Sequence, residues 1–326
     1  MNNQGADGYE IKPFPRYRDL MVDAGWNGQR KHTIHGFIEL DVTEARRLLR
    51  RHKAHTGETL SFTAFLLACL GQAVAFDRRV HACRARGRRV VLFDDVDVGL
   101  MIETELDGAK FPIGHVLRAV DKRTVQDMHD EIRSVQQQPS QAAGMRFTRI
   151  ACWLPSFLRR LMIRAIDRSP HRQRQATGTV GVTSVGMFGT RGGWGLGMPV
   201  HTLSVTVGGI ARKPGVVHDR VEIREYLDVT LSFNHDLVDG APAARFAQRF
   251  ADLVEEGYGL EALAGEECPA PPAAASSFAV ASLLVANPLL AGDPALAANP
   301  SLAARHSLAG SPLLAASPLL AADNNP

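Results

Sequence analysis

The sequence predicts an α/β protein, a two-layer sandwich of a mixed β-sheet and covering helices, followed by a low-complexity C-terminal tail. Strand-like alternation and helical spacing succeed each other between residues 33 and 256, which is typical of α/β folds. A six-residue repeat that fits neither period begins near residue 287. We therefore divide the chain into an N-terminal arm (1–29), a central domain (30–262) and the tail (263–326).

The first half of the central domain opens with a strand and two helices. Thr33 to Val42 alternates in hydrophobicity and predicts a strand. Thr43 is the expected N-cap of a helix that continues to His55. Ser61 is the expected N-cap of the next helix, which is apolar almost all round and is therefore expected to be buried. The following elements are a hairpin of Val90–Phe93 and Val96–Ile102 turned at Asp94-Asp95, a strand over Lys110–Ala119 and a helix over Thr124–Gln138.

A second amphipathic helix is predicted over Leu154 to Ile166, with one apolar face and one face rich in arginine. Three interpretations are open. The helix covers the core or a subunit interface, which we favour; it forms the wall of a channel for an acyl group or CoA; or it rests on a membrane surface, as basic amphipathic helices do. One short helix is a weak anchor, so no stable membrane attachment is expected.

The second half of the domain contains the remaining strands and one long helix. Strands are predicted from Thr179, over Thr202–Ile210 and over Glu222–Phe233, and a helix over Ala243–Glu256. Glycines are dense from Gly186 to Gly209, but no Lys-Ser or Lys-Thr ending follows them, so this segment is not a phosphate-binding P-loop. A loop between two strands is expected there.

The tail is a hexad repeat in which leucine recurs at every sixth residue from Leu290 to Leu320, with proline two residues before most of these leucines. Proline at this spacing interrupts any continuous helix and weakens a stacked β-helix. We expect a mostly disordered low-complexity tail. An array of short motifs that docks another protein is the alternative, because many weak copies act together through avidity.

Composition and charge limit the partners. The tail carries a net charge of −3 and the whole chain +3, so residues 1–262 carry +6, which suits an anionic ligand but is too diffuse for nucleic acid. Four cysteines without Cys-x-x-Cys spacing and a polar N-terminus favour a reducing cytoplasm. The pairs His32/His35 and His52/His55 have no nearby carboxylate or thiol partner, so no metal is expected.

The most informative run is Leu231 to Gly240, in which a strand delivers His235 and Asp239 follows four residues later. A histidine at a strand end exchanges a proton near neutral pH, and a carboxylate nearby can orient its ring. This arrangement suits a general base. On spacing alone, a histidine held in a loop before an Asp-Gly turn explains the run equally well.

This run resembles the His-x-x-x-Asp-Gly motif of the acyltransferase subunits of 2-oxo acid dehydrogenase complexes, which is also similar to that of chloramphenicol acetyltransferase. Gly178 to Gly189 resembles the family's Gly-Thr-Phe-Thr-Ile-Ser-Asn-x-Gly-Met-Phe-Gly run. The helix from Ser61 and the strand from Val96 also have counterparts, in the same order. The resemblance extends roughly from Lys31 to Gly257 and implies the fold of a CoA-dependent acyltransferase.

The resemblance implies a role for each site residue. His235 is the expected base that deprotonates a thiol. Thr183 occupies the position of the family's oxyanion-stabilising serine, and Ser184 is its neighbour, so either hydroxyl is a candidate. Asp239 is expected to form a structural ion pair with an arginine near the start of the domain, for which Arg30 is the candidate by position. The residues that bind CoA are not indicated.

The resemblance also implies a homotrimer or a larger assembly, with each active site shared between subunits. Two departures are apparent: the histidine stands in Asn234-His235-Asp236 where the family has Asp-His-Arg, and no lipoyl or peripheral-subunit-binding segment is recognisable. A lipoylated protein acting in trans is therefore an expected partner. The principal hypothesis is acyl transfer between CoA and a thiol such as dihydrolipoamide. The alternatives are a non-catalytic trimeric scaffold whose tail docks a partner, and an acyltransferase for a small molecule or carrier protein.

Overall fold

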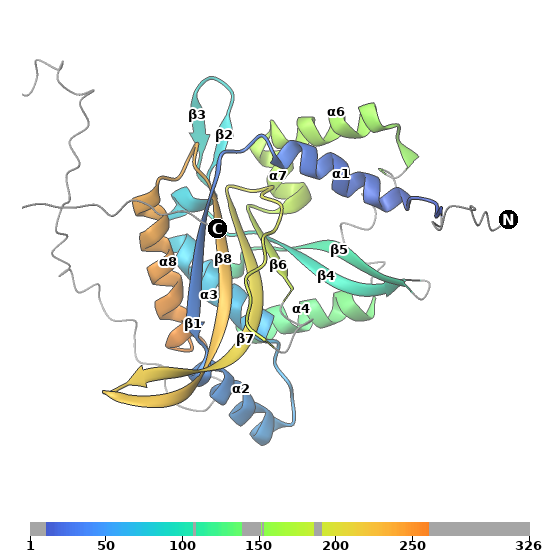
Figure 1. Cartoon of the computed structure of the whole chain (residues 1–326). Coiled ribbons are helices and arrows are strands. Elements are labelled where there is room, and N and C mark those ends of the chain that lie inside the picture. The colour runs from blue at the N-terminus through green and yellow to red at the C-terminus, as the bar shows by residue number, and fades with distance from the viewer. Residues whose placement is uncertain (1–10, 107–108, 139–150, 152, 186–190, 261–326) are drawn as a thin grey trace, which may run out of the picture. The chain divides into compact units, whose positions relative to one another are not determined.

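The computed structural model describes residues 11–106, 109–138, 151, 153–185 and 191–260. Within them, a six-stranded sheet has the order β1-β8-β7-β6-β4-β5, and β2 pairs with β3 in a separate ribbon (Figure 1). The pairs β4/β6 and β6/β7 are parallel and the others antiparallel, so the predicted mixed sheet is confirmed. The strands are β1 (Thr33–Asp41), β2 (Cys83–Ala85), β3 (Arg89–Val91), β4 (Val98–Leu106), β5 (Ala109–Leu117), β6 (Val180–Ser184), β7 (Leu203–Val217) and β8 (Arg220–Asn234).

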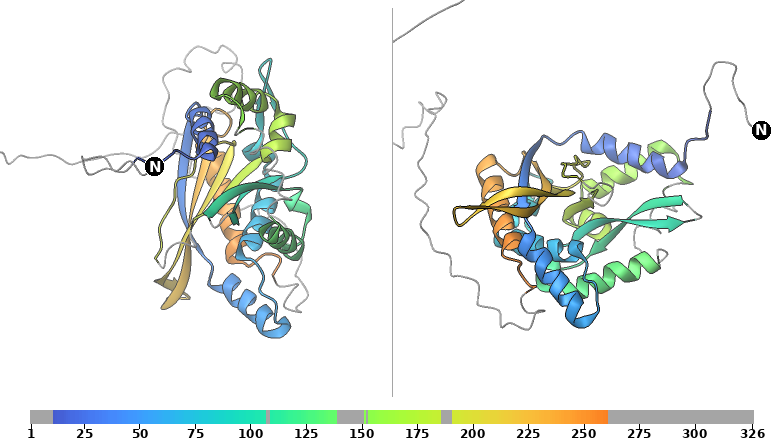
Figure 2. Two further views of the ribbon diagram at one scale, coloured as in Figure 1. Left: turned by 90° about the vertical axis from the view of Figure 1, so that its right-hand side faces the viewer. Right: turned by 60° about the horizontal axis from the view of Figure 1, so that its bottom comes forward.

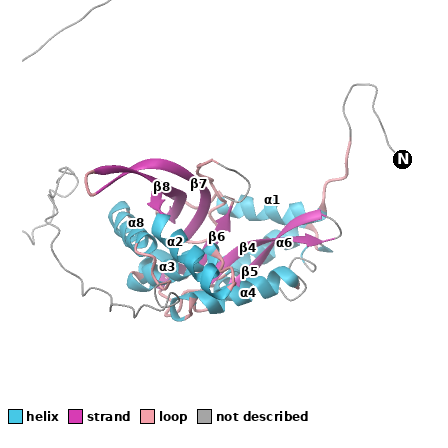
Figure 3. Ribbon diagram, turned by 90° about the horizontal axis from the view of Figure 1, so that it is seen from below, coloured by secondary structure: helices cyan, strands magenta, loops and turns pink. Residues whose placement is uncertain are grey.

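The helices of the main core cover one face of the sheet. α3 packs against α4 and α8, and Figure 3 shows these three helices on the same side of the strands. We call this the helix face and the opposite side the outer face. The described helices are α1 (Arg16–Gly28), α2 (Thr43–Thr56), α3 (Phe62–Phe76), α4 (Val125–Gln137), α6 (Ser156–Asp167), α7 (Pro170–Thr177) and α8 (Gly240–Glu255), with short 3₁₀ turns at Arg78–His81 and Val120–Lys122.

The helix from Ser61 is the centre of the core, as predicted. Ten of the residues of α3 are buried, because its apolar side chains face the sheet, α4 and α8 at once. The Ser61 hydroxyl accepts a hydrogen bond from the backbone N–H of Ala64 (3.4 Å), which confirms the predicted N-cap. The cap predicted for Thr43 is wrong. Thr43 lies inside α2, and its hydroxyl instead accepts a hydrogen bond from the N–H of Glu225 (2.8 Å) on β8.

The hairpin predicted to turn at Asp94-Asp95 is also wrong. β3 pairs with β2, and the turn between them lies at Gly87 (φ 72°) and Arg88 (φ 56°), a left-handed pair that glycine favours. β4 pairs instead with β5 and β6. The Asp95 carboxylate is occupied by Lys122 and Arg174, so the segment before β4 is an anchored loop.

β7 and β8 are longer than predicted and form a twisted hairpin that continues beyond the end of the sheet (Figure 1). The register shifts between Val207 and Ile210, where Gly208 and Gly209 lie. A side chain on Gly208 would collide with the carbonyl oxygen of Gly193, and one on Gly209 with that of Arg191. The glycine pair therefore lets the glycine-rich loop before β7 lie directly on the outer face. The predicted loop is confirmed for its described residues, 191–202.

The segment predicted as an N-terminal arm contains α1, which packs against α6 (Figure 2). The contact is a buried ion cluster: Arg159 Nε donates to Asp23 Oδ2 (2.8 Å) and Arg160 Nε to Asp23 Oδ1 (2.7 Å). Burial alone would raise the pKa of Asp23, but the two arginines outweigh it and the pKa lies below its ordinary value. No helix in the described parts of the chain is long and apolar enough to cross a membrane. The tail predicted to be disordered lies outside the described residues.

Candidate active site

His235 lies where β8 ends and turns towards α8. The N–H of Asn234 donates to the Thr202 carbonyl (2.8 Å), and the N–H of His235 donates to the His32 carbonyl (2.7 Å), so the backbone is held between β7 and the residues before β1. The His235 imidazole is exposed. The Asp236 carboxylate lies 2.9 Å from His32 Nδ1, which adds a side-chain link across the same loop. The histidine therefore stands on a fixed backbone with its ring free to meet a ligand or another subunit.

Asp239 is the residue before α8, with extended backbone (φ −79°, ψ 168°) and no capping bond from its side chain. Its carboxylate is exposed. The Arg30 guanidinium lies over the Trp26 ring, 4.2 Å from its centre, and within the described residues no ion pair joins it to Asp239. The predicted ion pair thus stays a prediction: in this single chain Arg30 lies on Trp26, and the Asp239 carboxylate faces solvent.

A pocket of about 360 Å³ opens beside the His235 loop, and we call it the basic pocket. Its charged lining comes from the residues before β1, the β2–β3 ribbon and α6, and contains four more cations than carboxylates. These residues are Arg30, Lys31, Arg84, Arg86, Arg164, Arg168, Asp167 and Asp236. Cys83 also lines it, but burial raises the pKa of this thiol to about 11, so it stays protonated at neutral pH.

Thr183 and Ser184 lie near the end of β6, and both are half-buried. Val182 belongs to the main core on the helix face. Because side chains alternate along a strand, Thr183 lies on the outer face. There it borders a second, largely apolar cavity of about 530 Å³, which we call the apolar cavity. The glycine-rich loop lies over this side of the strand, since a Cβ on Gly197 would stand 3.4 Å from the Thr183 methyl group.

The two halves of the predicted site do not meet within one chain. Asn234, at the end of β8, is hydrogen-bonded to Thr202 just before β7. Thr183 lies on β6, the strand on the opposite edge of β7, and is in register with Thr206, four residues further along β7. With strand geometry, this places His235 roughly 13 Å along the strands and about 10 Å across them from Thr183. A histidine and a hydroxyl that act on one carbonyl must both lie near hydrogen-bond distance from it.

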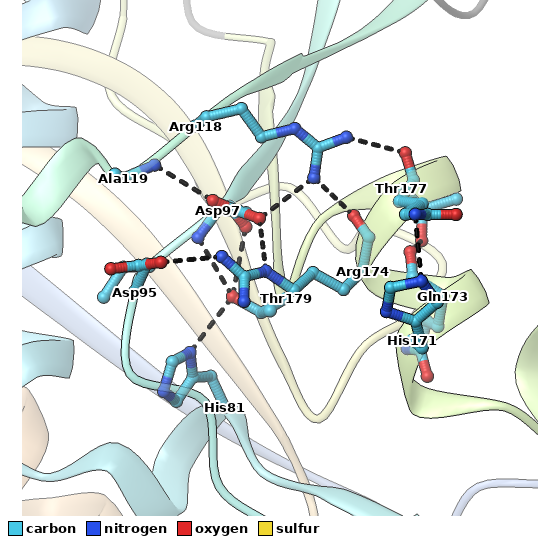
Figure 4. Close-up of polar contacts among 12 residues, drawn as sticks. His81, Asp95, Asp97, Arg118, Ala119, His171, Gln173, Arg174, Thr177 and Thr179 are labelled. Carbon is cyan, nitrogen blue, oxygen red and sulfur yellow. Dashed lines mark hydrogen bonds and ion pairs between the residues drawn. The ribbon is translucent and has the colours of Figure 1, made fainter.

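A buried polar cluster around Asp97 fixes the start of β6 (Figure 4). Arg118 Nη1 (2.9 Å) and Arg174 Nε (2.7 Å) both donate to Asp97 Oδ2, and the Ala119 N–H donates to Oδ1 (2.9 Å). The Thr179 N–H donates to the Asp97 carbonyl (2.6 Å). The hydrogen bonds to Asp97 and Asp95 raise the pKa of Arg174, which keeps it cationic. This cluster ties α7 and β6 to β4, so it positions the strand that carries Thr183.

Two ionisable groups with shifted pKa values line the pockets, Lys31 the basic pocket and His201 the apolar cavity. Burial lowers the pKa of Lys31, whose Nζ donates to the Val200 carbonyl and lies 3.8 Å from Asp167. Burial also lowers the pKa of His201 to about 4, with the nearby Lys31 charge acting in the same direction. His201 is therefore neutral at neutral pH. No group of three or more His, Cys, Asp or Glu side chains suited to a metal ion occurs in the described part of the chain.

Sequence reasoning missed Lys31, Asp97, His201 and both pockets. Asp97 lies within the predicted strand Val96–Ile102, just before β4 begins in the structure, and had no local partner to mark it, because Arg118 and Arg174 are distant in sequence. The arginine face of the predicted helix over Leu154 to Ile166 was a signal for the basic pocket, which Arg164 lines. That helix, α6, also lines the apolar cavity through Ile163 and Ile166.

The architecture matches a known fold. The chain has the fold of a probable dihydrolipoamide acetyltransferase from Listeria monocytogenes, with a TM-score of 0.58 and 19% identity over 77% of this chain and 97% of that one. The cubic core of the pyruvate dehydrogenase multienzyme complex gives a TM-score of 0.59 and 18% identity over 79% and 96%. The predicted fold of an acyltransferase catalytic core is confirmed.

The sequence comparison gives a family match over part of the chain. Residues 154–261 match the family described as 2-oxoacid dehydrogenases acyltransferase (catalytic domain), so the predicted resemblance is confirmed. The acetyltransferase component of the pyruvate dehydrogenase complex of Zymomonas mobilis is 31% identical over 103 residues, 32% of this chain and 23% of that protein. The succinyltransferase component of the 2-oxoglutarate dehydrogenase complex of Staphylococcus epidermidis is 22% identical over 231 residues, 67% and 46%. The chain thus spans a quarter to a half of these curated relatives.

Proposed function

We propose that the protein transfers an acyl group between CoA and a thiol acceptor such as dihydrolipoamide, with His235 as general base. The observation that carries the proposal is the placement of His235 on a backbone fixed to Thr202 and His32, at the end of a strand in a domain with an acyltransferase fold. The curated relatives are dihydrolipoyllysine acetyltransferases and succinyltransferases, which supports this reaction class.

In the proposed reaction, the neutral His235 imidazole takes the proton of the attacking thiol. The thiolate adds to the thioester carbonyl, and the hydroxyl of Thr183 or Ser184 donates a hydrogen bond to the oxyanion that forms. The intermediate then expels the other sulfur, which takes the proton back from the imidazolium. One thioester forms as the other breaks, and His235 ends as it began.

CoA is the proposed acyl carrier on the side of the basic pocket. Phosphate groups are bound by arginine and lysine side chains, and this pocket offers six of them against two carboxylates. The lipoylated acceptor would come from another protein in trans. The cytoplasmic location expected from the sequence stays a prediction.

A homotrimer or larger assembly is part of the proposal. His235 and Thr183 of one chain are too far apart to act on one carbonyl, so a complete site needs the histidine of one subunit and the hydroxyl of its neighbour. Asp239 and Arg30 would hold the histidine loop in that assembly, as the family resemblance implies. Removing one partner of such a pair, if buried, costs about 3–5 kcal/mol.

A non-catalytic trimeric scaffold is the alternative function, and the observation in its favour is the hexad-repeat tail, which offers many copies of one motif. Saturable CoA binding distinguishes the two, because a scaffold has no need of it.

The decisive experiment measures acyl exchange between acyl-CoA thioesters and dihydrolipoamide by the full-length protein. We expect His235→Ala to lower the exchange rate by about 10²- to 10⁴-fold while circular dichroism and mass by light scattering are unchanged. His218→Ala, at the tip of the β7–β8 hairpin, is the matched control and should keep the wild-type rate. Full exchange by a folded His235→Ala protein would exclude this mechanism.

A further inference from the structure

We propose that the apolar cavity holds the hydrocarbon chain of the acyl group, so that the preferred substrates are medium-chain or bulky apolar acyl thioesters rather than acetyl or succinyl thioesters. This inference rests on the proposed acyl transfer and names its substrate class. It follows from the walls of the cavity, its floor, its charge and its hydroxyl groups, taken in turn.

The walls are hydrocarbon and thioether side chains from two helices and a loop. α1 presents residues at helical spacing on one face, and α6 presents two isoleucines opposite the sheet. The glycine-rich loop closes a further side. The wall residues are Leu20, Met21, Ala24, Ile163, Ile166 and Met198. Such a surface gains from contact with methylene groups and offers little to the amides of a polar ligand.

The floor is the outer face of the sheet, where three neighbouring strands each carry a glycine. Gly181 lies on β6, Gly99 on β4 and Gly114 on β5, and all three line the cavity. A Cβ on Gly114 would meet only the Met101 sulfur, at 3.8 Å. The missing side chain at Gly114 therefore leaves depth above β5, whereas the space beside Gly99 and Gly181 is occupied by the Thr177 carbonyl oxygen and the His201 ring. The volume of the cavity, about 530 Å³, is typical of binding sites for whole small molecules. It far exceeds the volume of one methyl group, which is close to that of a water molecule, roughly 30 Å³.

The charge of the lining disfavours a carboxylate-ended acyl group. No arginine or lysine lines the cavity among the described residues. Asp167 is its carboxylate, already placed beside Lys31. Of its two histidines, His201 is neutral, because burial lowers its pKa to about 4, and His115 is bonded to Glu131 (2.6 Å). A succinyl carboxylate would therefore be buried without a free cation, which is strongly unfavourable.

Hydroxyl groups mark where the polar end of the acyl group would lie. Thr183, a proposed oxyanion donor, borders the cavity. Ser204 also lines it, is 9% exposed, and has a hydroxyl without a hydrogen-bond partner among the described residues. A buried unpaired hydroxyl is costly, so it indicates a ligand that supplies the missing bond. A thioester with its carbonyl near these groups and its chain along α1 and α6 satisfies both features.

The test compares kcat/KM for acetyl-, succinyl- and octanoyl-CoA with dihydrolipoamide as acceptor, using the full-length protein. Each methylene buried is worth roughly fourfold in kcat/KM, so we expect octanoyl-CoA to exceed acetyl-CoA by at least about 100-fold. Ala24→Phe fills the cavity from α1 and should lower the octanoyl-to-acetyl ratio at least about tenfold. Val22→Phe adds the same ring on α1 outside the lining, where Val22 is 55% exposed, and should leave the ratio unchanged.

A second variant, Ile163→Trp, fills the cavity from α6 and replaces Ala24→Phe if that protein does not fold. Calorimetry with a non-hydrolysable octanoyl-CoA thioether separates this inference from the proposed function. If no thioester is exchanged but the thioether binds and Ala24→Phe weakens that binding about tenfold, the cavity assignment stands and the proposed reaction fails. If exchange occurs with acetyl- or succinyl-CoA preferred, or if Ala24→Phe leaves the ratio unchanged, the cavity assignment is wrong.

Discussion

The two faces of the six-stranded sheet differ in chemistry although the same strands build both. On β8, Leu227, Val229 and Leu231 point to the helix face and are at most 1% exposed. Asp228 and Thr230, between them, point to the outer face and are equally buried, at 1% and 0%. Burial therefore does not distinguish the faces, whereas the type of buried atom does.

The helix face mainly stabilises the fold, whereas the outer face carries the groups that can meet a ligand or another subunit. The helix face is closed by α3 and α8 with apolar side chains, which stabilise the fold most when packed without gaps. The outer face contains hydroxyl groups, a glycine-rich loop and a cavity, and several of its buried oxygen atoms, such as Thr230 Oγ1 and Ser204 Oγ, have no partner among the described residues. Such atoms cost stability, so their presence marks the face that meets a ligand or a neighbour.

The largest effect is expected in an experiment that tests whether the active site on the outer face is formed by two chains. His235→Ala and Thr183→Ala proteins should each be nearly inactive, yet co-assembly of the two in equal amounts should restore activity. Roughly one site in four then receives an intact histidine and an intact threonine. Because a quarter of the sites are restored after losses of about 10²-fold or more, we expect a gain of at least about 25-fold over either variant in an exchange assay. Co-assembled protein as inactive as its parents would show that both groups act within one chain or not at all.

The next effect is on the helix face. Phe65 on α3 is fully buried, so Phe65→Ala should lower the free energy of unfolding by about 3–5 kcal/mol. The measurement is urea denaturation followed by circular dichroism. The contrasting change on the outer face, Thr183→Val, should cost less than about 1.5 kcal/mol, since it removes one hydroxyl from a half-buried residue and with it at most the net worth of one hydrogen bond. Equal losses of unfolding free energy for Phe65→Ala and Thr183→Val would contradict the conclusion that the helix face contributes more to stability than the outer face.

Thr183→Val should instead lower the exchange rate, by about 10²- to 10³-fold, because the hydroxyl that stabilises the oxyanion is lost. Thr183→Ser is the control and should retain most of the rate. The corresponding pair at Ser184, Ser184→Ala and Ser184→Thr, identifies which hydroxyl donates. If the valine variant keeps the wild-type kcat and the Ser184→Ala variant does not, the donor is Ser184.

The smallest effect concerns the acid sensitivity of the α1–α6 contact on the outer side. The folded pKa of Asp23 lies below its ordinary value of 3.8, so its contribution to stability is present above that pH and is lost as pH falls through the lowered value. Arg159, Arg160 and the nearby Asp19 are the charged groups around it. Trp26 fluorescence, in a background of Trp153→Phe and Trp194→Phe, should therefore change below about pH 4. Asp23→Asn should remove that transition; an unchanged acid transition would refute the assignment.

Much of the fold was predictable, because local patterns on the helix face are regular. The alternation in Thr33–Val42 and the apolar helix after Ser61 both led to correct elements. The hairpin at Asp94-Asp95 failed because the carboxylates there bond to Lys122 and Arg174, contacts that no local pattern contains. His235 and Thr183 were named from motifs, and their separation in one chain follows only from strand order. The arginine face of α6 gave a signal for the basic pocket, but the apolar cavity could not be predicted, since α1 and α6, which both line it, are more than a hundred residues apart in sequence.

The link from Asp23 to Arg159 and Arg160 bears on how shortened forms of the protein should be designed. A form that starts at residue 30, where the sequence alone would place the boundary, loses α1 and leaves two guanidinium groups facing each other with their shared counter-ion gone. The same cut removes the wall that α1 gives to the apolar cavity and opens that cavity to water. Loss of activity in such a form would report damage to its architecture, so a shortened form should retain α1.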